Sequence, residues 1–114
     1  MAIYANILPA AIVVPRYVGT PAASGVNHLI AAPAAGHSIC VTSFVLQSSG
    51  TVNVNFQDTS AVVLGTTFIF NAREGINRQA RDGDFLFAVA AGKGLDLNLS
   101  GAIAVAVEVE YVIT

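Results

Sequence analysis

Half of the charged side chains in this sequence lie in one short segment. The chain of 114 residues has five basic and seven acidic residues, and six of these lie in the stretch REGINRQARDGD: Arg73, Glu74, Arg78, Arg81, Asp82 and Asp84. Arginine is enriched at protein contacts because its planar guanidinium binds carboxylates and carbonyls at two points. We therefore predict a loop that contacts another copy of the chain, with Arg paired to Asp around a symmetry axis, or contacts a partner protein. A solvated loop that only supplies solubility is the alternative.

The other polar residues lack the spacing of a catalytic or metal site. His28 and His37 have no carboxylate or cysteine at ligand spacing, whereas a zinc site needs three or four ligands. Asp82 and Asp84 flank a glycine as in a calcium loop, but the remaining ligands of an EF-hand are missing. The sequence also has no nucleophile elbow. We expect no enzyme activity, no metal and no cofactor, and we expect both histidines on the surface or in turns.

Two further groups have simple structural interpretations. Glu108 and Glu110 are two residues apart, which places them about 6.6 Å apart on one face of a strand. We expect them to form a solvated face that discourages edge-to-edge pairing, with an ion pair to Arg16, Lys93 or a basic partner as the alternative. Cys40 is the only cysteine, so it closes no disulfide within the chain, and we expect it to be buried as a small apolar residue.

In the segments that must position these residues, the apolar and polar pattern repeats every two residues. Apolar and polar residues alternate in TVNVNFQ, LDLNLS and VAVEVEYVI, as in antiparallel strands that are wetted on one face. Turn sequences rich in Gly, Asp, Asn, Ser and Pro, such as SSG and RDGD, separate the apolar runs. Residues 22–32 have some helical spacing, but we assign them to a strand. The pattern predicts an all-β fold: a single antiparallel β-sandwich, jelly-roll-like, with about eight strands.

The N-terminal segment differs from the rest because its first 20 residues are apolar without clear alternation. We predict two parts: residues 1–25 form an N-terminal arm or edge strand, and residues 26–114 form the sandwich domain. An arm would pack on a neighbouring subunit, and its candidate contacts are Ile3, Tyr4, Ile7 and Leu8. The segment has no basic start, Pro9 interrupts it, and its apolar run of about 14 residues is too short to span a bilayer, so we expect neither a secretion signal nor a membrane segment.

The composition indicates that part of the surface is covered. Hydrophobic residues make up 54% of the chain and charged residues 11%, against about 25% charged residues in typical domains. A chain of this size has a high ratio of surface to volume and cannot bury so much apolar surface alone. We therefore predict contacts with copies of the chain or with a partner; an ordinary Ala-rich β-protein is the alternative. The net charge of −2 argues against nucleic acid as that partner.

Two stretches resemble small proteins of tailed bacteriophages. LIAAPAAGHSICVTSFVLQSSGTVNVNFQDTSAVVLG is similar to their segment LVAA.AGK.I.V....LQ..G...V.F, and AAGKGLDLNLSGAIAVAVEVEYVIT is similar to their ending AAGE.L.LNLS.A..V.....Y. The similarity covers about residues 26–114. It is weakest in FNAREGINRQARDGDFLF, where those proteins often have an aromatic NP.GWF segment. Proteins with these patterns look like head decoration, or cement, proteins.

The resemblance implies a structural virion protein without enzyme activity. Such a protein is made in the host cytoplasm and decorates the outer surface of the capsid. It is a β-sandwich, often a homotrimer, that binds the major capsid protein and holds the shell together where subunits meet. A tail, neck or head-fibre component, including a host-binding β-sandwich module, is the alternative. The chain has no tryptophan, which disfavours a version that binds glycans.

Overall fold

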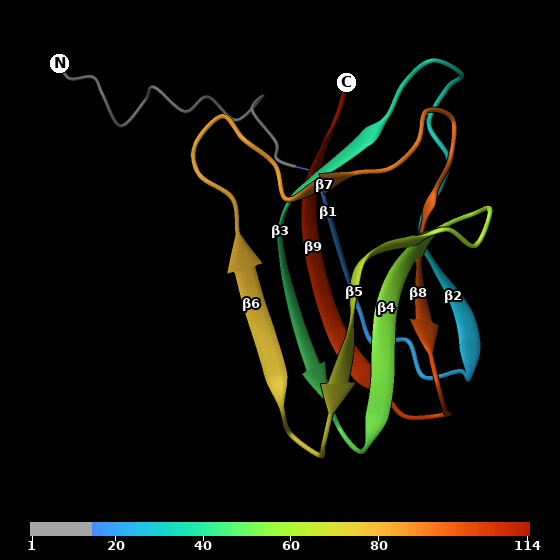
Figure 1. The fold of residues 1–114 in the computed structure, drawn as a ribbon, viewed down its shortest axis with the longest axis vertical. Coiled ribbons are helices and arrows are strands. Elements are labelled where there is room, and N and C mark those ends of the chain that lie inside the picture. Colours follow the sequence, from blue (N-terminus) through green and yellow to red (C-terminus); the bar gives the residue numbers. More distant parts are fainter. Residues whose placement is uncertain (1–14) are drawn as a thin grey trace, which may run out of the picture.

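The computed structural model describes residues 15–114, which form two antiparallel β-sheets (Figure 1). This part of the chain contains no α-helix, and hence no helix that is long and apolar enough to cross a membrane. Within residues 15–114 there are nine strands: β1 (Arg16–Gly19), β2 (Gly25–Ile30), β3 (Ile39–Ser48), β4 (Val52–Asp58), β5 (Val63–Phe70), β6 (Gly75–Gln79), β7 (Phe87–Ala88), β8 (Leu95–Leu99) and β9 (Val105–Ile113).

The strands are arranged in two layers that pack in a β-sandwich-like manner. The first sheet has the order β1-β9-β3-β6, and the short β7 pairs with the beginning of β3. The second sheet has the order β2-β8-β4-β5. Every pairing within both sheets is antiparallel. The predicted all-β fold is therefore confirmed, whereas the described residues contain nine strands where about eight were predicted.

The hydrophobic core lies between the two sheets. Nine alternating apolar residues of the three sequence stretches are buried, as predicted: Val52, Val54, Phe56, Leu95, Leu97, Leu99, Val105, Val107 and Val109. The prediction fails at the end of β9, where Tyr111 is only half-buried and Ile113 is 45% exposed. Phe44 of β3 meets Phe56 of β4 across the layers in an edge-to-face arrangement, with ring centroids 5.0 Å apart. Aromatic pairs prefer this geometry because the positive ring edge faces the negative ring face. Removal of these side chains from water is the main stabilising contribution.

The described part of the N-terminal segment is joined to the first sheet. Arg16 lies opposite Glu110 of β9, and Gly19 lies opposite Val107. Within residues 15–114, β1 is an edge strand, since β9 is its only neighbour in the sheet. The candidate arm contacts Ile3, Tyr4, Ile7 and Leu8 lie outside the described residues.

Two polar residues of the alternating stretches, Asp96 and Gln57, are buried instead of exposed. Asp96 of β8 is only 2% exposed, although its neighbours Leu95 and Leu97 occupy the opposite, inner face. His28 lies opposite Asp96 on β2, and its Nδ1 is 2.8 Å from Asp96 Oδ1. Gln57, which lies opposite Asp96 on β4, is buried as well. The hydrogen bond allows a carboxylate to remain buried there, because an unpartnered one would be costly.

A single glycine tests the pairing of β6 with β3. A Cβ at Gly75 would overlap the backbone oxygen of Leu46, which cannot rotate away as a side chain can. We expect Gly75→Ala to lower the free energy of unfolding by about 1–3 kcal/mol through overpacking, measured by urea denaturation. Gly101→Ala is the matched control, because nothing lies within 4 Å of a Cβ at that position. Equal stabilities of the two variants would contradict the pairing.

Candidate functional site

The structure divides the charged segment into two turns and a strand. Arg73 and Glu74 lie between β5 and β6, Arg78 lies on β6, and the other three charges follow β6: Arg81, Asp82 and Asp84. The prediction of one continuous loop is wrong, because Gly75–Gln79 pairs with β3. The five residues of β6 separate the two turns by about 17 Å at the usual rise of a strand. The six side chains are therefore distributed along one edge of the first sheet and do not form a single cluster.

The arginines of this edge lack ion partners among residues 15–114. Arg16, at the opposite edge of the sheet, is the only Arg or Lys of the described residues in an ion pair. Its Nη1 lies 3.0 Å from Glu108 Oε2 and its Nη2 lies 3.9 Å from Glu110 Oε2. The predicted alternative for these two glutamates, an ion pair with Arg16, is thus observed on the outer face of the sheet. The charges of the arginines in the segment remain available to a partner.

Two of the acids support the backbone of the turns. Glu74 Oε1 accepts a hydrogen bond of 2.6 Å from the N–H of Asn71, which closes the connection between β5 and β6. Asp84 Oδ1 accepts a bond of 2.9 Å from the N–H of Phe85. The N–H of Asp84 donates to the carbonyl of Arg81 at 2.9 Å, and Gly83 within that turn has φ 77°. These bonds define the shape of the loop that follows β6.

Arg73 has a strained backbone. Its φ of 69° lies in the left-handed region, which costs a residue with a side chain about 1–2 kcal/mol. Its N–H donates to the carbonyl of Ser48 at 2.7 Å, and the N–H of Ser48 donates to the carbonyl of Glu74 at 2.8 Å. These bonds hold the turn in place, and the side chain lines a depression together with Thr20 and Ser49. Backbone strain of this kind persists only where the surrounding structure enforces it, and it is common at functional sites.

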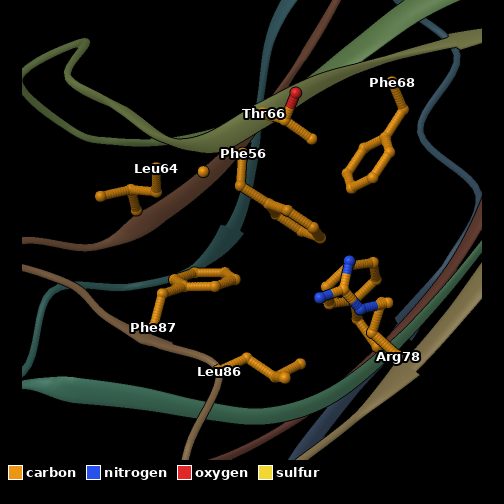
Figure 2. Close-up of a pocket in the computed structure, with 9 residues that line it drawn as sticks. Phe56, Leu64, Thr66, Phe68, Arg78, Leu86 and Phe87 are labelled. Atoms are coloured by element: carbon orange, nitrogen blue, oxygen red, sulfur yellow. The ribbon is translucent and has the colours of Figure 1, made fainter.

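A cleft of about 290 Å³ opens between β5 and β6 (Figure 2). Figure 2 shows Arg78 extending its guanidinium toward the apolar side chains of the cleft. Within the described part of the chain, β5 pairs only with β4, and β6 pairs only with β3. Both strands beside the cleft therefore have one unpaired backbone edge. The lining residues are mostly apolar: Phe44, Phe56, Leu64, Gly65, Thr66, Phe68, Arg78, Leu86 and Phe87.

Arg78 was predicted from its residue type and position, whereas the cleft was not predicted. The one signal of the cleft in the sequence is the pair of aromatic runs TTFIFN and FLFAV, which lie on either side of the charged segment. Two of the rings, Phe44 and Phe56, come from distant strands. Only the packing of the two sheets brings them to the same opening, and no local pattern indicates this.

The remaining candidate groups have structural partners. His28 pairs with Asp96, and His37 Nδ1 lies 2.8 Å from the carbonyl oxygen of Thr114. Cys40 is buried, as predicted. Across residues 15–114, no three His, Cys, Asp or Glu side chains are grouped so that they could hold a metal ion.

Comparison with known proteins adds no assignment. No protein-family model, no curated protein and no solved structure matches this chain. The function must therefore be inferred from the charged edge, the cleft beside it and the sequence itself.

The strain at Arg73 can be measured directly. Arg73→Gly removes about 1–2 kcal/mol of left-handed strain and adds about 0.5–1 kcal/mol of backbone entropy cost. We expect a net gain of about 0.5–1 kcal/mol in the free energy of unfolding, measured by chemical denaturation. Arg73→Ala, which removes the guanidinium but keeps the strain, should not be stabilised. A destabilised glycine variant would show that the side chain of Arg73 supports the fold.

Proposed function

We propose that this protein is a structural virion component that decorates the outer surface of a bacteriophage capsid. One observation carries the proposal: an edge of the fold presents Arg73, Arg78 and Arg81 without ion partners in residues 15–114, beside an apolar cleft. Arginine and aromatic side chains dominate the binding energy of protein interfaces. The similarity of about residues 26–114 to head decoration proteins suggests the partner, the major capsid protein, and a symmetric oligomer as the binding unit.

The strand order gives the proposal further support. We propose that the fold is a jelly roll, the two-sheet architecture of eight strands that occurs in viral capsid proteins. Within residues 15–114, each sheet has a path of four strands, β1-β9-β3-β6 and β2-β8-β4-β5, and the two-residue β7 is an addition beside β3. The chain passes repeatedly from one sheet to the other, as in such folds.

Exposed apolar side chains also favour the proposal that a partner covers part of the protein surface. Ile69 on β5 is 77% exposed and Val18 on β1 is 66% exposed. Single exposed apolar residues are ordinary in soluble proteins. In a chain with only 11% charged residues, however, they add to a surface that is poorly solvated. A partner that covers part of this surface would stabilise the protein.

The mechanism is mechanical. A shell under pressure from packaged DNA fails where its subunits separate, and a protein bound across a seam adds contacts that must break first. A ligand that binds only the assembled lattice stabilises it by mass action, by about 2.7 kcal/mol per site at one hundred times the dissociation constant. This role requires no catalytic residue, metal or cofactor.

The copy number in purified particles tests the proposal. Quantitative mass spectrometry against the major capsid protein should give a ratio near one to one, as expected for decoration of the whole lattice. A few copies per particle would contradict decoration and would favour the alternative, a tail, neck or head-fibre component, including one that binds the host.

The contact surface can be tested on capsids that lack this protein. We expect the double variant Arg78→Ala with Arg81→Ala to raise the dissociation constant at least about tenfold, because interface arginines often contribute more than 1.4 kcal/mol. Sedimentation of the bound protein with capsids measures this. Arg16→Ala is the matched control, since Arg16 is paired with Glu108 and lies at the opposite edge of the sheet. Unchanged binding by the folded double variant would exclude this edge as the capsid contact.

A further inference from the structure

An exposed phenylalanine directly precedes two residues that line the cleft. Phe85 is 49% exposed and is the only one of the six phenylalanines, all of which lie in the described residues, with a largely exposed side chain. It follows Asp84 in the loop after β6, and the next two residues, Leu86 and Phe87, line the cleft. Exposure of a phenyl ring is unfavourable by about 25 cal/mol per Å². The loop therefore presents an apolar projection with a carboxylate next to it.

The cleft has the size and chemistry to receive such a projection. A closed apolar cavity of about 150 Å³ holds a benzene molecule, and the cleft has about 290 Å³. Its lining contains four phenylalanine rings, against which another ring can pack edge-to-face. Arg78 extends into the same cleft and has no ion partner among residues 15–114 (Figure 2). In a ligand that carries a phenyl ring and a carboxylate, the ring would pack against the phenylalanines and the carboxylate would pair with Arg78.

We propose that two copies of this chain pair through this patch. Phe85 of each copy enters the cleft of the other, and Asp84 of each copy forms an ion pair with Arg78 of the other. The projection and the cleft are neighbours on the same patch, so the patch is complementary to itself. Such a contact is isologous and has a two-fold axis, whereas a head-to-tail ring needs the two features on different faces. This contact therefore produces a dimer, in place of the trimer that the resemblance implies.

The purified full chain tests the pairing without any capsid. Sedimentation equilibrium at micromolar concentration should give the mass of two chains. Phe85→Ala should weaken the dimer at least about tenfold, because aromatic residues at the centre of an interface contribute most to binding. Its thermal unfolding at low concentration should match that of the unaltered chain, because the ring of Phe85 is exposed in the single chain.

A charge exchange tests the predicted ion pair. Arg78→Glu and Asp84→Arg alone each place like charges opposite one another at both ends of the interface, so each should weaken the dimer at least about tenfold. In an equimolar mixture of the two variants every contact again joins opposite charges, and the dimer should recover. Lys93→Glu is the control, because it reverses a charge outside the patch and should leave the dimer intact.

Three results would overturn the pairing: a monomeric or trimeric mass for the unaltered chain, a dimer that Phe85→Ala leaves unchanged, or a mixture of the charge variants that fails to recover. The pairing shares Arg78 and the cleft with the proposed capsid contact, but these measurements use the purified chain without capsids and so test the pairing separately. An intact dimer that does not bind capsids would contradict only the proposed function.

Discussion

Contact between the inner faces of the two sheets determines where every other feature of this protein lies. Phe44 from one sheet and Phe56 from the other meet at 5.0 Å in the core, and the leucines of β8 complete the buried layer. Because successive side chains of a strand point to opposite faces, burial of one face fixes the direction of all polar neighbours. The exposed position of Glu108, and its ion pair with Arg16, follow from this packing.

Two open sheets packed in this sandwich-like manner also have edges, and one of these edges becomes the candidate site. Between β5 and β6 the inner faces reach the surface, so rings that belong to the core also line a cleft. Unpaired strand edges invite association, and charged residues on them restrict which partners can pair. The arginines of this edge therefore have a double effect. They oppose indiscriminate strand pairing, and under the proposed function they would select a partner that brings carboxylates.

Two local departures from the simple pattern show how the fold accommodates unfavourable groups. Asp96 is buried on the outer face of β8, where His28 supplies a hydrogen-bond partner. Arg73 adopts a left-handed backbone that suits glycine, and backbone bonds to Ser48 and from Ser48 to Glu74 hold it there. Neither feature is visible in a pattern of alternating residues, because each depends on a neighbour from a distant strand.

The sequence by itself determined the class of fold, because alternation over five to nine residues specifies strands and their buried faces without knowledge of their neighbours. It also indicated the burial of Cys40 and showed that half of the charged residues are concentrated between Arg73 and Asp84. Tertiary structure alone decided that Gly75–Gln79 is a strand: GINRQ has one apolar residue, Ile76, and becomes a strand through its pairing with β3. Tertiary structure also determined the position and lining of the cleft, because Phe44 and Phe87 meet at one opening only after strands far apart in the sequence have paired.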